Sequence, residues 1–266
     1  MSAPIFEAPI HALVRGVPDA YVHCLRPESA APDVALAREQ HARYVAALVD
    51  AGVEVVRLDA DEAHPDCCFV EDTAVILGGR GLLTRPGAPS RRGECPAIAA
   101  ALAARCDLQA MREPAVLDGG DVLRAGSLLF VGLSGRTDEA GARELAGVAA
   151  RDGLEVRTVP VVGGLHLKSA VTLVDAGTLV LHAGALDAAP FLAAGLDVLR
   201  VDEPAGGNVL ALGRRVLVSA AAPATGRLLA ARGLDVVTVD VSEFHKGDGA
   251  LTCLSLRVPA AGRWCA

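Results

Sequence analysis

Three regions far apart in the sequence carry the side chains that covalent catalysis requires: Cys253, His166 and the acidic pair Asp118 and Asp121. Cys253 follows the glycine-rich turn segment KGDG and lies in an expected strand over residues 248–258. A thiol can act as a nucleophile, an imidazole can move protons, and a carboxylate can orient the imidazole. These residue types predict a thiol enzyme whose catalytic groups meet only in the folded chain.

Further acidic residues predict a cationic ligand for this site. Asp66, Glu71 and Asp72 precede an expected strand, and desolvated carboxylates need a partner charge. A planar guanidinium pairs with carboxylates through two parallel hydrogen bonds. Arg91 in RPGAPSRRGE and Arg136 in GLSGRT lie in expected loops and could hold a carboxylate at the opposite end of the ligand. An amino acid with a guanidinium side chain would satisfy both ends.

The expected chemistry is attack by the thiolate of Cys253 on the guanidinium carbon. His166 would protonate the departing amine, leaving an S-alkylthiouronium on the cysteine, and would then activate a water that releases a urea-type product. Asp118 could accept a hydrogen bond from His166 and favour its protonated form.

A repeated pattern of elements would position these residues. Five segments begin with a polar residue and continue as a short apolar strand, and four of them read as β-hairpins. The aligned polar residues recur at intervals of roughly 40 to 50 residues, the range of repeat architectures. These aligned residues are Asp72, Asp121, Ser169, Asn208 and Thr252.

Helical patterns separate the hairpins and lead into a further strand. They are expected over 33–51, 96–105, 138–152 and 225–232, and the strands that follow helices include VEVVRL, LEVRTVPV, DVLRVD and LDVVTVD. The predicted fold class is therefore α/β: a five-bladed propeller of ββαβ modules around a central channel, with pseudo-five-fold symmetry. The polar residues at the strand starts would converge on that channel.

The composition supports this fold and excludes several partners. Of 266 residues, 52% are hydrophobic but only 3% are aromatic, so the core must consist of Val, Leu and Ala in short strands. The net charge of −7, without a basic cluster, argues against a nucleic-acid partner. No signal peptide and no apolar run of membrane-spanning length is recognisable, so we expect a cytoplasmic protein without a membrane partner. We expect one domain over residues 1–266.

The seven cysteines do not form a metal-binding or disulfide pattern. They lack CxxC pairs, which argues against a structural zinc site, and a cytoplasmic setting argues against disulfides. Most are expected to be small buried hydrophobic residues. Their positions are 24, 67, 68, 95, 106, 253 and 265.

Six motifs carry a resemblance to a known family: DCCFVEDTAVIL, RPGAPSRR, LDGGDVL, GLSGRT, GLHLKSAVTLV and DGALTC. In this order they are similar to segments of dimethylarginine dimethylaminohydrolases, which are guanidino-modifying enzymes with the five-bladed α/β propeller (pentein) fold. The similarity runs from about Leu13 to Cys253 and beyond, and so covers nearly the whole chain.

The resemblance implies conversion of asymmetric dimethylarginine and monomethylarginine to citrulline plus dimethylamine or methylamine. It implies Cys253 as the nucleophile, His166 as the general acid and base, and Asp118 as the acid that orients His166. It implies no cofactor and no metal, a methylated arginine as the small-molecule partner, and a monomer or homodimer.

The resemblance also implies seven substrate-binding positions. Two carboxylates, Glu71 and Asp72, meet the guanidinium end of the substrate, and Asp66 is a further substrate-binding acid. Arg91 and Arg136 hold the α-carboxylate, and the backbones of the lid loop at Leu25 and of the turn at Gly247 touch the ligand.

Other classes of function remain open at this point. Another guanidino-modifying enzyme, such as an arginine deiminase or an amidinotransferase, would use similar residues, although arginine deiminases are usually longer and carry an inserted helical module. A non-catalytic propeller that binds a protein partner would be expected to lack the Cys–His pair. A cysteine protease is disfavoured because an acidic channel offers a peptide carbonyl no stabilising donors.

Overall fold

The computed structural model describes residues 10–27, 30–103 and 105–259. Their strands are β1 (Ile10–Arg15), β2 (Glu54–Leu58), β3 (Ala74–Ile76), β4 (Arg80–Leu83), β5 (Asp107–Ala110), β6 (Val122–Ala125), β7 (Leu128–Leu133), β8 (Glu155–Pro160), β9 (Val171–Leu173), β10 (Thr178–His182), β11 (Asp197–Val201), β12 (Leu210–Leu212), β13 (Arg215–Ser219), β14 (Asp235–Val239) and β15 (Leu256–Pro259).

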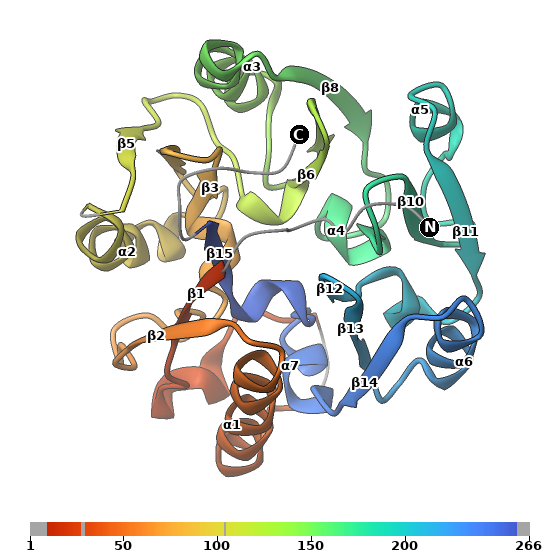
Figure 1. Ribbon diagram of the computed structural model, residues 1–266. Coiled ribbons are helices and arrows are strands. Elements are labelled where there is room, and N and C mark those ends of the chain that lie inside the picture. The colour runs from red at the N-terminus through yellow and green to blue at the C-terminus, as the bar shows by residue number, and fades with distance from the viewer. Residues whose placement is uncertain (1–9, 28–29, 104, 260–266) are drawn as a thin grey trace.

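These strands form five three-stranded sheets arranged as a ring (Figure 1). The sheets are β3-β4-β5, β6-β7-β8, the β9-β10-β11 set, β12-β13-β14 and β15-β1-β2. In each sheet the central strand pairs antiparallel with one neighbour and parallel with the other. The expected five-module α/β propeller is confirmed.

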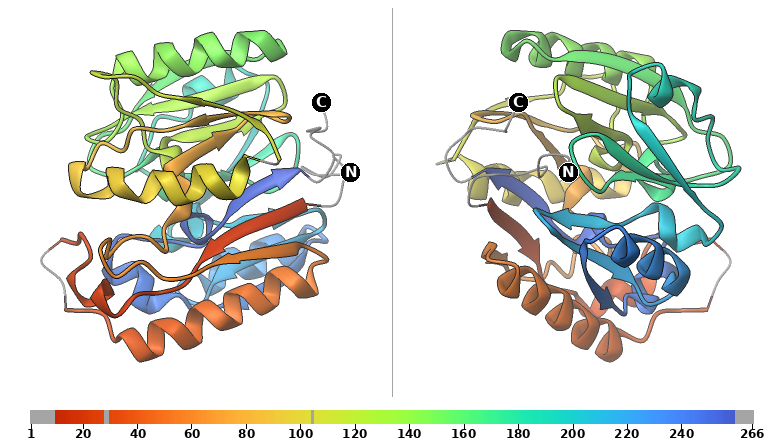
Figure 2. Two further views of the ribbon diagram at one scale, coloured as in Figure 1. Left: turned by 90° about the vertical axis from the view of Figure 1, so that its left-hand side faces the viewer. Right: turned by 45° about the vertical axis from the view of Figure 1, so that its right-hand side comes forward.

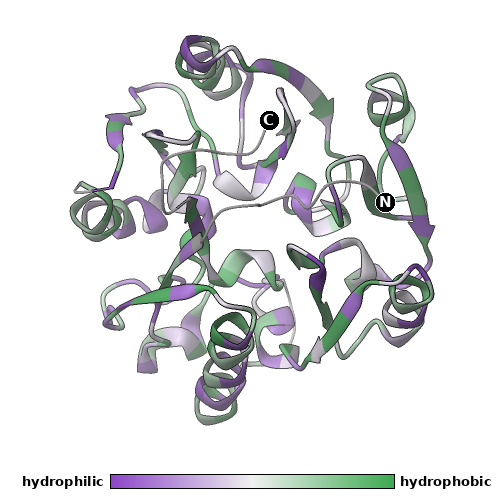
Figure 3. Cartoon of the chain, in the orientation of Figure 1, coloured by the Kyte–Doolittle hydropathy of each residue, from purple (hydrophilic) through white to green (hydrophobic). Residues whose placement is uncertain are grey.

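A helix makes the crossover that each parallel pair requires. The crossover helices are α1 (Val34–Asp50), α2 (Cys95–Leu102), α3 (Glu139–Ala149), α5 (Ala189–Leu192) and α6 (Pro223–Ala231). They lie on the perimeter of the ring, with α1 and α3 on opposite outer sides (Figures 1 and 2). Their residues are both hydrophilic and hydrophobic, as helices with one face on the core require (Figure 3).

The chain closes the ring by pairing its first described strand with its last. In β1 and β15, His11 lies opposite Val258 and Leu13 opposite Leu256. Because each module of a repeat fold buries its apolar surface against its neighbours, this pairing removes the exposed ends that an open array would have.

The expected helices are confirmed with shifted ends. Asp33 caps α1 by accepting the N–H of Leu36 at 3.1 Å, and Gly52 follows the helix at φ +82°. The helix α2 ends earlier than expected, at Leu102, and a 3-10 turn over Ala150–Asp152 follows α3. Strand β5 and helix α5 had no expected counterpart, because elements of four residues carry too little periodicity to be recognised.

A short helical turn precedes the first strand of every module, where the sequence had indicated only a strand start. These turns are η2 (Val70–Thr73), η4 (Gly119–Asp121), α4 (Leu167–Ala170), η6 (Pro204–Gly207) and η7 (Thr252–Leu254). The expectation that Cys253 lies in a strand is therefore wrong: it lies in η7, and β15 begins at Leu256. Adjacent turns contact one another and so gather the polar residues of different modules.

The core has the composition that the sequence predicted. It consists mainly of buried Val, Leu and Ala side chains in clusters within and between modules. The aromatic residues gather locally: the ring centroids of Tyr21 and Phe69 lie 5.9 Å apart, and those of Tyr21 and Phe244 lie 5.7 Å apart. This aromatic group lies beside the candidate site, because Phe69 also lines its pocket.

Candidate active site

A small pocket contains nearly all of the expected functional residues. Its cavity volume is about 20 Å³, which is room for about one water molecule. The lining residues are Leu25, Asp66, Phe69, Asp72, Arg91, Arg136, Leu165, His166, Gly247, Asp248, Gly249 and Cys253.

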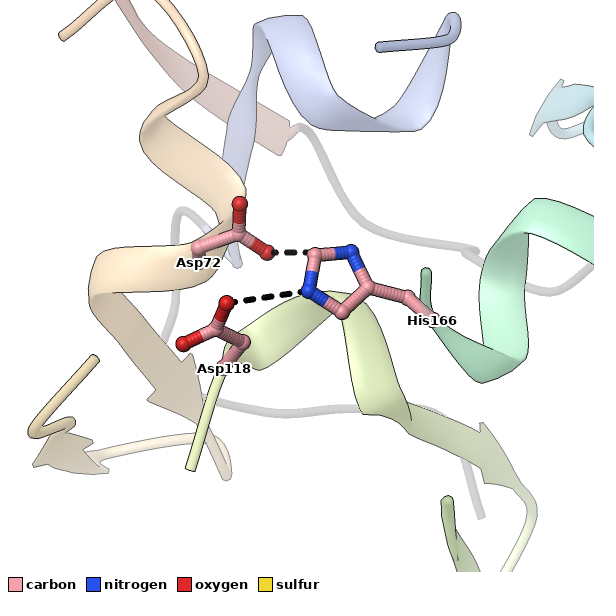
Figure 4. Close-up of side chains that lie close together, drawn as sticks. All are labelled: Asp72, Asp118 and His166. Atoms are coloured by element: carbon pink, nitrogen blue, oxygen red, sulfur yellow. Dashed lines mark hydrogen bonds and ion pairs between the residues drawn. The ribbon is translucent and has the colours of Figure 1, made fainter. Parts of the chain in front are cut away.

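His166 lies at the start of α4 and is held by two carboxylates from other modules (Figure 4). Its Nε2 lies 2.9 Å from Oδ2 of Asp118, and its Nδ1 lies 3.8 Å from Oδ1 of Asp72. Burial alone would lower the pKa of His166, but the charge of Asp72 and the hydrogen bond to Asp118 outweigh burial and raise it to about 9. His166 is therefore an imidazolium at neutral pH.

Asp118 is fully buried and fixed from several sides. Its Oδ1 accepts the N–H of Gly87 at 2.9 Å, and its own N–H donates to the hydroxyl of Thr137 at 3.1 Å. Nη1 of Arg136 lies 3.9 Å from Oδ2 of Asp118. These contacts leave Asp118 positioned to orient the imidazole, the role expected from the sequence.

Asp72 is an ionised carboxylate at the centre of the site. Its Oδ2 lies 2.5 Å from Nη1 of Arg91, and its Oδ1 accepts the N–H of Gly120 at 2.9 Å. Burial would raise the pKa of Asp72, but the charges of His166 and Arg91 lower it to about 2. The negative charge required for binding a guanidinium is therefore present at neutral pH.

Cys253 is a neutral thiol in the ligand-free chain. It is partly exposed in η7 and lines the pocket together with His166. Burial and the negative charges of Glu71 and Asp72 raise the pKa of its thiol to about 12. A cation bound beside Cys253 would stabilise the thiolate, because an opposite charge favours the charged form.

The glycines of LDGGD permit the close approach of these groups. A Cβ atom on Gly120 would lie 2.6 Å from Nδ1 of His166 and 2.7 Å from Oδ1 of Asp72. A Cβ atom on Gly119 would lie 2.1 Å from the carbonyl oxygen of Glu71. The motif is thus more than a turn, because side chains at these positions would displace the catalytic groups.

Arg91 lies in the pocket but not at the end away from the acids, where the sequence argument had placed it. Besides contacting Asp72, its guanidinium donates to both carboxylate oxygens of Glu94 at 3.0 and 2.8 Å and to the carbonyl oxygen of Phe69 at 2.9 Å. A buried guanidinium requires partners of opposite charge, and these acids provide them. Arg136, in contrast, keeps 22% of its side chain exposed and has one longer ion pair, 3.9 Å from Nη1 to Oδ2 of Asp118.

Leu25 and Asp66 form one rim of the pocket. The carboxylate of Asp66 accepts the backbone N–H of Leu25 at 3.0 Å, and Leu25 is 38% exposed. Burial raises the pKa of Asp66. Gly247 follows α7 (Ser242–Lys246), and a Cβ atom there would lie 2.9 Å from the hydroxyl of Tyr21.

Glu71 does not share the pocket with Asp72: in the ligand-free chain it faces another cavity, and its expected role at the guanidinium stays a prediction. Its carboxylate pairs with Nζ of Lys168 at 2.6 Å and with Nη2 of Arg257 at 3.2 Å, and it accepts the hydroxyl of Thr252 at 2.7 Å. These groups line a second cavity of about 120 Å³ between the first strands of the modules. Consecutive residues of a 3-10 turn point about 120° apart, so neighbouring acids face different spaces.

Four lining residues were not expected from the sequence: Phe69, Leu165, Asp248 and Gly249. All four lie within motifs already recognised, so membership of those motifs was the available signal. A Cβ atom on Gly249 would lie 2.2 Å from the ring of Phe69, which explains the glycine. Asp248 has φ +59°, the left-handed conformation that non-glycine residues seldom adopt, and such conformations cluster at functional sites.

Asp72, Asp118 and His166 also form a group whose potential metal-ligating atoms lie within 4.8 Å of one another (Figure 4). Their charges are already paired within the chain, since Arg91 contacts Asp72 and the imidazolium contacts Asp118. We therefore interpret the group as a charge-paired catalytic cluster. Of the cysteines, Cys265 lies outside the described residues, and the other six have free thiols.

In the described part of the chain, no helix has both the length and the apolar character needed to cross a membrane.

Comparison with known proteins agrees with this geometry. A scan against protein-family models finds no match. An N(G),N(G)-dimethylarginine dimethylaminohydrolase from Streptomyces coelicolor is 42% identical over 228 residues, which cover 85% of this chain and 87% of the relative. The enzyme of the same name from Pseudomonas aeruginosa is 30% identical over 255 residues, covering 95% of this chain and 98% of the relative.

Solved structures give the same result. The structure of a cysteine-to-serine variant of the dimethylarginine dimethylaminohydrolase from Pseudomonas aeruginosa in complex with citrulline superposes with a TM-score of 0.90, at 30% identity. The match covers 95% of this chain and 100% of that one. On sequence, coverage and fold together, this chain belongs to the dimethylarginine dimethylaminohydrolase family.

Proposed function

We propose that this protein hydrolyses N-ω-methylated arginines, namely asymmetric dimethylarginine and monomethylarginine, to citrulline plus dimethylamine or methylamine. The observation that supports it most is the arrangement of the pocket: a thiol, an imidazolium paired with a carboxylate, and an ionised aspartate face one small space. Family membership and the citrulline complex of the relative from Pseudomonas aeruginosa support the same reaction.

Substrate binding would set the ionisation of the nucleophile. The substrate guanidinium pairs with Asp72, and this cation offsets the negative charges that keep Cys253 protonated. For this to happen, Arg91 must release Asp72, since its guanidinium now lies against that carboxylate. Arg136, and Arg91 once released, then bind the α-carboxylate, while Asp66 and the backbones of Leu25 and Gly247 complete the site.

The first half-reaction forms a covalent intermediate. The thiol of Cys253 releases its proton to solvent as the cation binds, and the resulting thiolate attacks the guanidinium carbon and forms a tetrahedral adduct. The imidazolium of His166 gives its proton to the methylated nitrogen, the C–N bond breaks, and dimethylamine or methylamine leaves. An S-alkylthiouronium remains on Cys253, and His166 is now neutral.

The second half-reaction returns the enzyme to its starting state. Neutral His166, oriented by Asp118, takes a proton from a water as its oxygen attacks the thiouronium carbon. The C–S bond breaks as the hydroxyl proton of the adduct passes to the departing sulfur, so citrulline is released and the thiol of Cys253 is restored. All groups required for both steps belong to the chain, and we propose that it acts without a cofactor. We also propose that residues 1–266 form a single catalytic domain and that the protein is a cytoplasmic monomer or homodimer.

Citrulline formation measured side by side with dimethylarginine, monomethylarginine and arginine tests this function. We expect turnover of both methylated substrates, with one molecule of the amine released per citrulline. Turnover of arginine with little turnover of the methylated substrates would instead identify an arginine deiminase. Absence of citrulline with all three would contradict the proposed activity.

A further inference from the structure

The buried carboxylate of Asp121, in the LDGGD motif, has no part in the reaction described above, yet it is fully enclosed. Its Oδ1 accepts the N–H of Leu167 at 2.8 Å. Its Oδ2 accepts the hydroxyls of Ser134 and Thr137, both at 2.7 Å. All three donors are uncharged, although a buried carboxylate is normally paired with a cation.

Each of the three donors leads directly to a residue of the active site. Leu167 follows His166 in the chain. The hydroxyl of Thr137 also accepts the N–H of Asp118 at 3.1 Å. The hydroxyl of Ser134 also accepts the N–H of Arg136 at 3.0 Å.

We infer that Asp121 is a positioning residue that fixes His166, Asp118 and Arg136 relative to one another. The effect of this positioning on catalysis rests on the proposed function, whereas the hydrogen bonds of Asp121 are part of the structure itself. The carboxylate binds the first turn of α4, which begins just after the base, and both hydroxyls of the loop that carries the substrate-binding arginine.

Close packing restricts the orientation of the Asp121 side chain. Gly132 of β7 approaches so closely that a Cβ atom there would lie 2.6 Å from Oδ1 of Asp121 and 2.9 Å from Cβ of Leu167. Three hydrogen bonds to one buried carboxylate also define its orientation, because every lone-pair direction that they use is fixed by backbone or by a short side chain.

Electrostatics adds a second link between Asp121 and His166. The charged or titratable groups around the imidazole are Asp72 from η2, Asp118 and Asp121 at η4, Lys168 on α4 itself, and Asp66, Arg91, Arg136, Asp248 and Cys253 in the pocket. Burial raises the pKa of Asp121, whereas the charge of His166 lowers it, and the charge of Asp121 in turn raises the pKa of His166. Removal of the charge of Asp121 should therefore lower the pKa of His166.

The substitution Asp121→Asn tests the inference, because it keeps the size and one acceptor but removes the charge. We expect kcat to fall about tenfold or more, since a hydrogen-bonded buried carboxylate is lost. The titration of His166, followed by NMR and assigned by the signal lost in His166→Gly, should move to lower pH. The fall of kcat/KM on the alkaline side should move in the same direction.

Glu203 provides a matched control outside the pocket lining. Its carboxylate accepts the N–H groups of Ala224 and Thr225 at 2.9 and 2.7 Å and the hydroxyl of Thr225 at 2.9 Å, at the start of α6. It therefore makes the same kinds of contact without a catalytic neighbour. Glu203→Gln should leave kcat and the titration of His166 unchanged.

Two further variants test separately the contact through Ser134 to Arg136 and the contact through Thr137 to Asp118. They remain informative if Asp121→Asn does not fold. Ser134→Ala removes the acceptor for Arg136, so it should raise KM while leaving the His166 titration in place. Thr137→Val removes the acceptor for Asp118, so it should lower kcat more than it raises KM. Identical effects of Ser134→Ala and Thr137→Val, or an unchanged His166 titration in Asp121→Asn, would overturn the inference.

The titration needs no turnover, so it is independent of the proposed reaction. If the wild-type protein makes no citrulline, the proposed function fails, while the shift of the His166 titration still decides whether Asp121 controls this imidazole.

Discussion

Glu71 and Asp72 are consecutive acids on the same turn, both buried, and they serve different regions of the molecule. Asp72 faces the pocket with Cys253 and His166, where its present partner, Arg91, must be exchanged for a substrate. Glu71 faces the second cavity, where Lys168, Arg257 and Thr252 already satisfy it. In the proposed reaction Asp72 exchanges its partner for the substrate, whereas Glu71 keeps all of its partners within the chain.

This difference separates a binding carboxylate from a structural one. An acid satisfied by fixed partners in its own fold stabilises the structure and has little affinity left for a ligand. An acid with a displaceable partner can bind a ligand cation in its place. Sequence position alone cannot distinguish these cases, because both acids belong to the same motif.

The largest effect is expected at Cys253, on the pocket side. Cys253→Ser should abolish turnover, because a hydroxyl without a strong base is a poor nucleophile at neutral pH. Cys95→Ser is the matched control: its Sγ already lies 3.6 Å from the carbonyl oxygen of Thr84, which a hydroxyl can use, and it should keep activity. The two variants are compared by their initial rates of citrulline formation, after circular dichroism has shown that both are folded. Appreciable activity of Cys253→Ser would rule out the thiol mechanism.

Asp72→Asn should have the next largest effect. It keeps the shape of the side chain but leaves the substrate cation without its counter-charge, so kcat/KM should fall about a hundredfold or more. Steady-state kinetics with dimethylarginine measures this. Near-normal kcat/KM would mean that the pocket does not recognise guanidinium charge, and the substrate class would have to be reconsidered.

A smaller effect is expected at Arg136, which binds the α-carboxylate end of the substrate in the proposed complex. Arg136→Ala should raise KM about tenfold with a lesser change in kcat, because the partner of the α-carboxylate is lost. The decarboxylated analogue agmatine should be a poor substrate of the wild-type protein for the same reason. If agmatine is used as well as methylarginine, the role given to the arginines is wrong.

The smallest effect on activity is expected at Glu71, where the consequence should be structural. Glu71→Gln leaves Lys168 and Arg257 without their carboxylate and should lower the free energy of unfolding by about 2 kcal/mol. Its kcat/KM should stay within about fivefold of the wild-type value. Denaturant titration and kinetics on the same preparation measure both quantities. A loss of kcat/KM equal to that of Asp72→Asn would show that both acids bind the guanidinium after all.

The sequence was sufficient to predict the module and its five-fold repetition, because alternating short strands and amphipathic helices leave clear patterns. It also predicted Cys253, His166 and Asp118 as catalytic residues, and the structure places the first two in one pocket with Asp118 hydrogen-bonded to His166. It could not predict the direction in which a side chain leaves a 3-10 turn, and so placed Glu71 beside Asp72. The buried pairing of Arg91 with Glu94 was also missed, since it depends on packing that no local pattern records.

Mass spectrometry of the intermediate tests the central claim most directly. A His166→Gly variant lacks both the acid that expels an amine and the base that hydrolyses the intermediate, so it is given S-methyl-L-thiocitrulline, whose methanethiol group leaves without that acid. It should therefore accumulate a covalent modification. We predict that peptide mapping will place the added mass on Cys253, and that its value will equal that of S-methyl-L-thiocitrulline after loss of methanethiol. A modification on another cysteine, or citrulline formation at the wild-type rate without any adduct, would contradict the mechanism.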